Sequence, residues 1–241
     1  MALAATPGIF VANSGVLPAY QSEFPYSQFV KWYESAHIPD WMGAKPGAIT
    51  AAWRYQSLDP DRELPFLVTY RYPDVAAQSA PEFTQVTLNH PSLPEGGPIT
   101  KFTKFEVLAG SHVETWRSGS TGDARGPLLV TETIQPAANT TKAFTDWYQS
   151  TYITELSLMD GWRRTSRFDV GGGKWFALHE FETRAFDENT TKIEGLLGRR
   201  SEETKEVERT AKSVNLAIWE LVRVYGDSKG AWGLPGTDSI L

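Results

Sequence analysis

Residues Phe29 to Ile38 read Phe-Val-Lys-Trp-Tyr-Glu-Ser-Ala-His-Ile, and residues Phe144 to Ile153 read Phe-Thr-Asp-Trp-Tyr-Gln-Ser-Thr-Tyr-Ile. Within one chain the two stretches share Phe, Trp, Tyr, Ser and Ile in the same register. Similarity of a chain to itself at a fixed spacing indicates the architecture before any single element is assigned. The pair therefore predicts a chain built from two copies of one unit.

The repeat continues after these stretches in the same order. Gly47 leads to Trp53-Arg54-Tyr55 as Gly161 leads to Ser166-Arg167-Phe168, and Phe105-Glu106-Val107 corresponds to Trp219-Glu220-Leu221. Each copy reads as β-α-β-β-α-β, the order of the ferredoxin-like motif. The predicted elements of the first copy are 8–16, 25–42, 48–55, 65–72, 75–88 and 101–108, and those of the second are 127–134, 140–158, 162–168, 174–181, 189–212 and 214–225.

Two local patterns support this division into helices and strands. Phe29, Trp32, Tyr33, Ala36 and His37 recur at the spacing of one helical face. Residues 171–173 are three consecutive glycines between two apolar runs, and glycine adopts the positive φ that a tight hairpin requires.

These elements give the predicted domain organisation. The first ferredoxin-like unit covers residues 1–117, a turn-rich linker 118–126, the second unit 127–225 and a C-terminal tail 226–241. A ferredoxin-like sheet carries helices on one face and leaves its other face apolar, and that face has to be buried. We expect an α+β protein in which the second copy buries it, forming an intramolecular version of the barrel that other proteins build from two subunits.

Composition narrows the classes of function. The 241 residues carry a formal net charge of −6, which disfavours nucleic acid and anionic membrane surfaces as partners. The chain has no cysteine, so disulfides and thiolate chemistry are excluded, and its four histidines lack metal-ligand spacing. Neither a signal peptide nor a membrane span is predicted, and a cytoplasmic location is expected.

The segment Phe29-x-x-Trp-Tyr-x-x-x-His37-Ile-Pro39, followed by Gly47 and a strand ending in Arg54-Tyr55, resembles the EthD-like branch of the dimeric α+β barrel superfamily. The resemblance implies a cofactor-free dehydratase, decarboxylase, cyclase or isomerase acting on polyketides or other aromatic metabolites, while more distant relatives bind haem. It places the helix-borne histidine of the family at His37. Tyr152 holds this position in the second copy, which implies one competent site and one unit acting as scaffold.

The candidate catalytic residues are His37 as base and Tyr33, one helical turn earlier, as a phenolic donor to an enolate oxygen. Such a pair suits enolisation, dehydration or aldol-type closure of a keto-rich substrate. The alternative is that His37 caps the helix or fills the core. The residues predicted to contact substrate are Trp32, Trp53, Tyr70, Tyr152, Trp175 and His179.

Other polar residues are expected to have structural roles. Arg54 and Arg167 could bind a carboxylate, but we expect salt bridges to Glu106 and Glu220. His90 and His112 are predicted in or beside loops. Asn139 and Asn189 are expected to cap helices.

The sequence thus predicts a cofactor-independent cyclase, isomerase or lyase for a hydrophobic polyketide-like or terpenoid-like metabolite, including pericyclic cyclisation by substrate folding. A haem-binding oxidoreductase with an axial histidine and a noncatalytic metabolite-binding protein are the alternatives. The leading reading requires no cofactor and no metal. The expected partner is a small apolar substrate, with no nucleic acid and no membrane, and the protein is expected to be a monomer or a homodimer.

Overall fold

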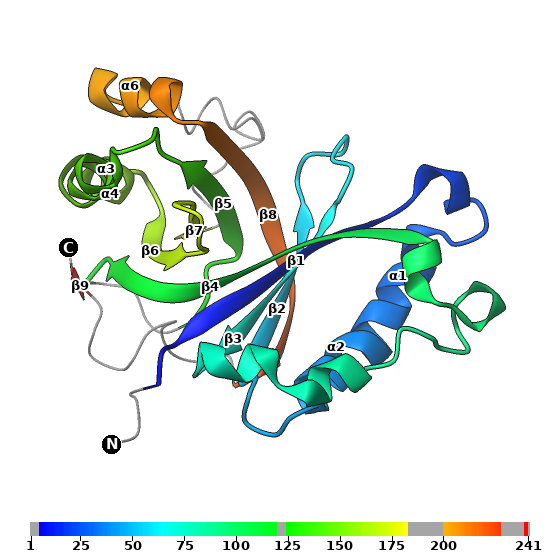
Figure 1. The fold of residues 1–241 in the computed structure, drawn as a ribbon. Helices are drawn as coiled ribbons and strands as arrows, with labels where there is room; N and C mark the ends of the chain where they lie inside the picture. The colour runs from blue at the N-terminus through cyan, green and yellow to red at the C-terminus, as the bar shows by residue number, and fades with distance from the viewer. Residues whose placement is uncertain (1–4, 120–123, 183–199, 228–238, 241) are drawn as a thin grey trace. The chain divides into compact units, whose positions relative to one another are not determined.

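The computed structural model describes residues 5–119, 124–182, 200–227 and 239–240, and the chain divides into two compact units. The first unit comprises residues 1–56, 60–109 and 222–228, and the second comprises 57–59, 110–221 and 229–241. Two long strands, β4 (Thr103–Arg117) and β8 (Ser213–Gly226), give residues to both units (Figure 1).

The sheet of the first unit has the strand order β4-β1-β3-β2-β8. β3 (Phe66–Tyr72) pairs antiparallel with β1 (Gly8–Val16) and with β2 (Ala51–Ser57). Side chains alternate between the two faces of a strand, so every second residue of each strand faces the helices. The order β4-β1-β3-β2 is that of a ferredoxin-like unit.

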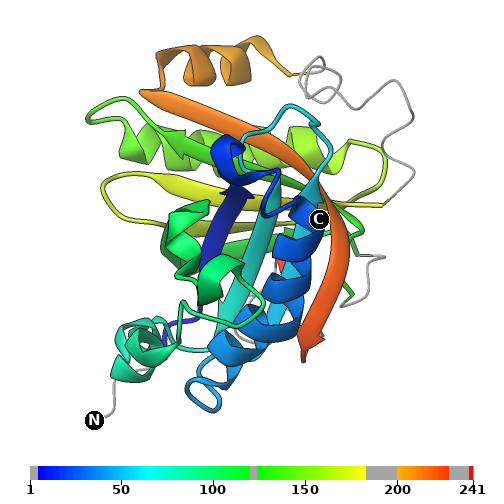
Figure 2. The ribbon, with the colours of Figure 1, turned by 90° about the vertical axis from the view of Figure 1, so that its right-hand side faces the viewer.

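One long helical segment covers this sheet in the first unit (Figures 1 and 2). It consists of α1 (Tyr26–Trp32), a π turn (Tyr33–His37) and α2 (Ile38–Gly43), which confirms the helix predicted over 25–42. The apolar stripe is buried against the sheet, with Phe29 at 0% and Trp32 at 2% exposure. The π turn, which the sequence pattern did not predict, interrupts the helix at the two candidate catalytic residues.

The second helix predicted for the first copy, over 75–88, is wrong. Residues Val75–Ser79 and Pro81–Gln85 form two short 3-10 turns instead. Pro81 cannot donate a backbone hydrogen bond, and the residue before a proline is pushed out of the helical region. Ala80 accordingly has φ −66° and ψ 134°, which ends the first turn.

The remaining turns of the first unit precede β4. They are short 3-10 turns at Pro18–Tyr20, Pro94–Gly96 and Ile99–Lys101. β4 begins at Thr103 and continues to Arg117, well past the predicted end at residue 108. His112 therefore lies in a strand and not in or beside a loop.

The second unit repeats the same strand order with its own strands. Its own strands are β5 (Leu128–Gln135), β6 (Trp162–Asp169) and β7 (Trp175–Phe181). Together with β4, β8 and the short β9 (Ser239–Ile240) they form a sheet of order β8-β5-β7-β6-β4-β9, in which β9 pairs parallel with β4. The predicted glycine hairpin between β6 and β7 is confirmed, because residues 171–173 have φ of 79°, 62° and 70°.

The main helical segment of the second unit consists of α3 (Thr141–Trp147), a π turn (Tyr148–Tyr152) and α4 (Ile153–Ser157). Asn139 does not cap it. This residue has φ 64°, and Thr140 occupies the capping position, where its hydroxyl donates to the Ala137 carbonyl and makes no capping hydrogen bond to the helix.

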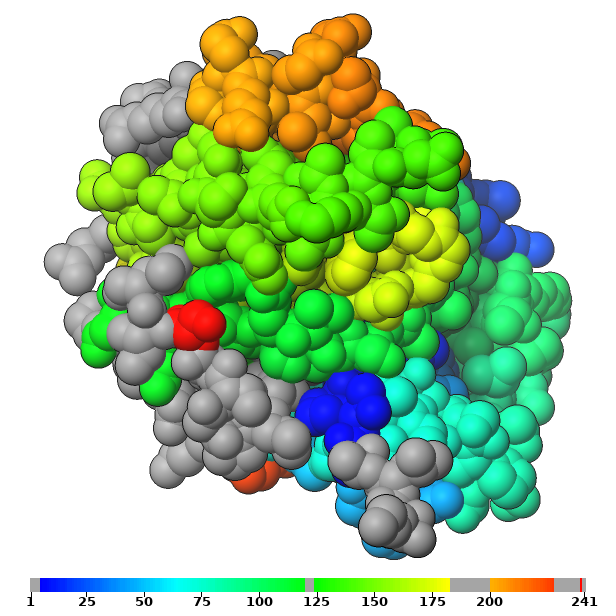
Figure 3. Space-filling view, turned by 60° about the vertical axis from the view of Figure 1, so that its left-hand side comes forward, coloured from blue at the N-terminus to red at the C-terminus, as the bar shows by residue number. Residues whose placement is uncertain are grey.

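A second helix, α6 (Glu202–Thr210), lies over α3 and α4 (orange over bright green in Figure 3). The Trp147 indole donates to Thr204 Oγ1 at 3.2 Å, and the Ser201 hydroxyl caps the helix by accepting from the Thr204 backbone N–H. Of the predicted helix over 189–212, residues 189–199 lie outside the described residues, as do Asn189 and the tail residues 228–238. No helix in the described part of the chain is long and apolar enough to cross a membrane.

Candidate functional site

The helix–sheet interface of the first unit contains an aromatic cluster around His37. The imidazole stacks on Trp32 with ring centroids 4.9 Å apart and on Tyr33 at 5.4 Å. Trp41, one turn later, lies 6.1 Å away, and Phe105 of β4 lies 6.5 Å away. The π turn Tyr33–His37 ends at this histidine and changes the phase of the helix there. Such turns occur frequently at functional sites.

The His37 ring carries a buried nitrogen that no protein group satisfies. Its Nδ1 has no hydrogen-bond partner, although buried polar atoms in folded proteins nearly always have one. Burial lowers the pKa of His37 from 6.5 to about 4, because the charged imidazolium loses its hydration. At neutral pH this residue is therefore an uncharged imidazole that can accept a proton.

Tyr33 supplies a complementary donor on the same helix. Burial raises the pKa of its phenol well above the usual value, so the hydroxyl stays protonated. The hydroxyls of Ser14 and Tyr70 lie near enough to shift this pKa, but the Tyr33 oxygen makes no hydrogen bond of good geometry with either. A base and a phenol with unused capacity thus lie next to one another.

Aromatic rings continue along the helix-facing side of the sheet. Trp41 packs 5.8 Å from Phe10, 6.4 Å from Tyr70 and 5.1 Å from Phe83. Of the predicted substrate contacts, Trp32 and Tyr70 belong to this cluster, and both are 2% exposed.

Trp53, another predicted contact, lies on the other face of β2. Arg54, next in the strand, faces the helix, and the alternation of the strand turns Trp53 away. Its indole lies under the Arg71 guanidinium at 5.9 Å. The structure therefore separates Trp53 from His37 and Tyr33.

Arg54 does not pair with Glu106 as expected. Its Nη2 lies 2.5 Å from Glu34 Oε1 on the π turn, and Glu34 also binds Arg223 of β8 at 2.6 Å. Glu106 pairs with Lys104 instead. The helix, and not the neighbouring strand, holds the carboxylate that Arg54 meets.

Tyr152, Trp175 and His179 belong to the second unit, where a buried polar cluster lies under α3 and α4. The Tyr152 hydroxyl donates to Glu132 Oε1 at 3.1 Å, and His179 Nε2 lies 3.5 Å from Glu132 Oε2. Glu132 is 1% exposed and was missed in the sequence. The signal was its place in β5, where alternation puts this carboxylate on the apolar face with Val130 and Ile134.

A chain of polar contacts leads from Trp162 to His179. The Trp162 indole can only donate, and it donates to Thr165 Oγ1 at 3.0 Å. Thr165 Oγ1 in turn lies 3.0 Å from His179 Nδ1. The other ring nitrogen of His179, Nε2, faces Glu132.

Arg167, the residue that matches Arg54, is also buried. It pairs with Glu114 of β4, not with the predicted Glu220. Its guanidinium lies over the rings of Tyr148 at 4.5 Å and Trp175 at 4.7 Å, so aromatic faces compensate its charge. Trp175 therefore packs against the buried guanidinium of Arg167 and helps to stabilise its charge.

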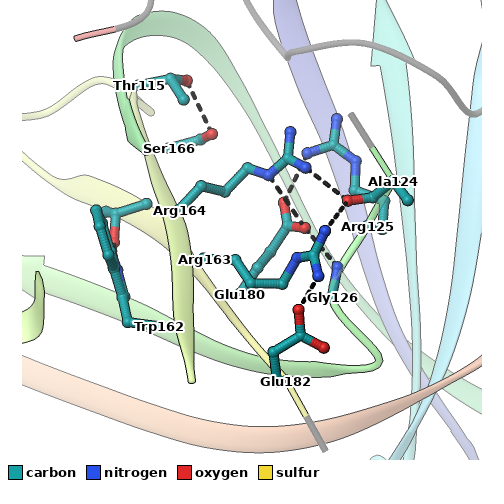
Figure 4. A network of polar contacts seen from close by, with 11 residues as sticks. Thr115, Ala124, Arg125, Gly126, Trp162, Arg163, Arg164, Ser166, Glu180 and Glu182 are labelled. Atoms are coloured by element: carbon teal, nitrogen blue, oxygen red, sulfur yellow. Dashed lines mark hydrogen bonds and ion pairs between the residues drawn. The ribbon is translucent and has the colours of Figure 1, made fainter. Parts of the chain in front are cut away.

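The opposite face of the same sheet holds a second buried ion cluster (Figure 4). The Glu180 carboxylate accepts from Arg125 at 2.6 Å and from the Gly126 backbone N–H at 2.8 Å, and it lies 3.4 Å from Arg164. These groups lower the pKa of Glu180 despite its burial. The contacts anchor residues 124–126, part of the predicted linker, to the sheet.

The histidines differ in how they are bonded. His112 contacts Thr115 Oγ1 at 2.8 Å and His90 contacts Ser92 Oγ at 2.7 Å, whereas the buried Nδ1 of His37 has no hydrogen-bond partner in the part of the chain that the structure describes. Within the described residues, no group of three or more acidic, histidine or cysteine side chains could hold a metal ion.

Comparison with known proteins finds similarity only at the level of structure. No family model and no curated protein matches the sequence. An anthrone oxidase-like protein superposes with a TM-score of 0.58 at 10% identity, covering 94% of this chain and 96% of its own. Chlorite dismutase from Candidatus Nitrospira defluvii gives 0.58 at 10% identity, covering 92% of each chain. A protein from Fusobacterium nucleatum described as a candidate monooxygenase gives a TM-score of 0.56 at 11% sequence identity, covering 95% of this chain and 98% of its own.

At these identities the likeness shows the fold alone. The chain shares the fold of these proteins, and each of its units has the ferredoxin-like strand order. That fold hosts several chemistries, so the function has to be argued from the side chains of the site.

Proposed function

We propose that the first unit catalyses proton transfer on an apolar, keto-rich metabolite, as a cofactor-independent cyclase, isomerase or lyase. The observation that carries the proposal is the pairing of an unsatisfied, uncharged His37 with an unsatisfied, protonated Tyr33 in a buried aromatic cluster. A base and a hydrogen-bond donor in a low-dielectric environment are the two groups that enolisation requires.

The lowered pKa of His37 limits the substrate. An imidazole whose pKa is about 4 is a weak base, and it removes a proton efficiently only from a carbon that is itself acidic. A methylene flanked by carbonyls or by aromatic rings meets this condition, and polyketide-like compounds carry such groups. His37 would take the carbon-bound proton while the Tyr33 hydroxyl donates to the enolate oxygen that forms.

The aromatic cluster has a second role in this proposal. The rings of Trp32, Trp41 and Phe105 lie within 6.5 Å of the imidazole and shield part of it from water. Planar rings hold an apolar substrate by stacking and fix its orientation, which lowers the entropic part of the barrier.

The test uses the compound that accumulates when the gene is deleted from a producing strain. Purified protein and this compound are incubated in D2O, and product and deuterium incorporation are followed by mass spectrometry. The wild type should form product and exchange the acidic C–H, His37→Ala should lose most of both, and Tyr33→Phe should slow both. Turnover at the wild-type rate by His37→Ala would refute the proposal and favour catalysis by substrate folding alone.

The proposal extends to the origin of the fold. We infer that the two units descend by tandem duplication from an EthD-like ancestor and that the second has lost the helix-borne histidine. The matched strand order and the π turns at Tyr33–His37 and Tyr148–Tyr152 support this inference. In this reading the Glu132, Tyr152 and His179 cluster stabilises the second unit.

A haem-binding oxidoreductase is the second candidate, and the bonding of the histidines favours one ligand for it. The buried Nδ1 of His37 has no hydrogen-bond partner among the described residues, whereas His90 and His112 contact serine and threonine hydroxyls and His179 faces Glu132. His37 would then hold the haem, and haem would supply redox chemistry. Titration with haemin decides this: a Soret band that His37→Ala abolishes would support the candidate, and no band in the wild type would eliminate it.

A further inference from the structure

The Arg54 guanidinium is buried with unused hydrogen-bonding capacity. Arg54 is 3% exposed, and among the described residues only its Nη2 has a partner, the Glu34 carboxylate. Its Nε and Nη1 are buried and have no acceptor in the described part of the chain. An unsatisfied buried donor costs free energy, and the cost is larger for a charged group. The arrangement is therefore incomplete without an acceptor.

The local charge count points to an anion as that acceptor. Glu34 is shared between Arg54 and Arg223, which lies 2.6 Å from the second carboxylate oxygen. One negative charge thus balances two positive charges. An additional carboxylate would neutralise the excess, and its two oxygens match the planar fork of a guanidinium.

Two phenols lie near the Arg54 guanidinium. The hydroxyls of Tyr33 and Tyr225 are both buried atoms without a hydrogen-bond partner. Both lie close enough to Arg54 for its charge to favour their anionic forms. The Tyr225 side chain is half-buried and Arg223 is exposed, so the cluster borders on solvent at the end of β8.

The second unit provides an internal comparison. Arg167 occupies the matching strand position, pairs with one carboxylate and likewise has Nε and Nη1 without acceptors. However, its guanidinium lies over aromatic rings at 4.5 and 4.7 Å, which compensate its charge. No ring of the described residues lies over the Arg54 guanidinium in this way, so the charge of Arg54 lacks the compensation that Arg167 has.

We propose that Arg54, with the hydroxyl of Tyr225, forms an anion subsite that binds a carboxylate of the substrate, while the Tyr33 hydroxyl remains the donor to the enolate oxygen. This inference deepens the proposed function, because it assigns the ligand of the same site to the class of apolar aromatic or polyketide-like acids. Tyr33 joins the subsite to His37, so the carboxylate fixes the substrate with its reacting carbon toward the imidazole.

The test measures binding of 2-naphthoate and of its uncharged analogue 2-naphthamide by isothermal titration calorimetry. The wild type should bind the acid at least about tenfold more tightly than the amide. Arg54→Gln should lose this preference, since charge-assisted hydrogen bonds are the strong ones. Glu34 keeps Arg223 as a partner in that variant, so its carboxylate is not left unpaired. Arg167→Gln is the matched control and should keep the preference for the acid.

Equal affinity of the wild type for acid and amide, or an undiminished preference in Arg54→Gln, would overturn the proposal. The comparison of the two ligands on the wild type stands even if a variant fails to fold. Because the assay involves no turnover, it can fail while the deuterium exchange at His37 succeeds, and the reverse is equally observable.

Discussion

Lowering the pH should destabilise the protein through His37, and the magnitude follows from its burial. The pKa is 6.5 in the unfolded chain and about 4 in the folded protein. Between these values the unfolded state binds more protons, so the free energy of unfolding falls as the pH falls. The part of the stability that depends on an uncharged His37 is fully present above about pH 6.5 and is lost as the pH falls toward 4. The pKa falls from 6.5 to about 4 on folding, and each pH unit corresponds to about 1.4 kcal/mol, so the free energy of unfolding falls by roughly 3 kcal/mol in total. Of this, about 2 kcal/mol is already lost at pH 5.

The assay compares wild type with His37→Gln by urea unfolding at pH values from 7.5 to 4.5. Deletion of the imidazole shifts stability by a constant amount, and only the pH dependence is compared. Burial also lowers the pKa of His112 to about 4, but His112 titrates in both proteins and cancels in the difference. The difference in unfolding free energy should change by about 2 kcal/mol between pH 7.5 and pH 5.

An NMR titration of the imidazole protons provides an independent measurement. The His37 signals should remain those of the neutral ring down to about pH 5. A difference curve that is flat with pH, together with a His37 titration near 6.5, would refute the burial of this ring and with it the uncharged base of the proposed mechanism.

Four further substitutions test the structure by chemical denaturation. Glu180→Gln should cost about 3 to 5 kcal/mol, because two buried guanidinium groups lose their carboxylate; a cost below about 1 kcal/mol would contradict the cluster. Tyr152→Phe should cost about 1 to 3 kcal/mol by removing the donor to Glu132, and no loss would mean that this bond is absent. Gly226→Ala should cost more than about 1 kcal/mol, since φ is 68° and the added Cβ would lie 2.5 Å from a carbonyl oxygen. Gly43→Ala, where nothing lies within 4 Å, should be neutral or stabilising; equal losses at the two glycines would contradict both placements.

Patterns that depend on neighbours in the sequence were read correctly. The helical stripe from Phe29 to His37 predicted the long helix, and the three glycines at 171–173 predicted the hairpin. The prediction of a helix over 75–88 was wrong for a reason that is visible in the sequence, because Pro81 lies in the middle of this range.

The site itself was predicted in part. His37, Tyr33, Trp32 and Tyr70 lie together, because one helical face and one strand face meet across the first unit. The partners of the arginines were predicted wrongly, since Glu34 comes from the helix where a strand residue was expected.

By itself the sequence determined the strands and the first helix of each unit, the apolar stripe that carries His37 and the position of the glycine hairpin, because backbone propensity and periodicity act over a few residues. Only the tertiary structure decided that Arg54 meets Glu34, that Arg167 meets Glu114 and that Glu132 meets Tyr152 and His179. These contacts depend on strand register and on the phase that a π turn gives to a helix. A shift of one residue in a strand turns a side chain to the opposite face.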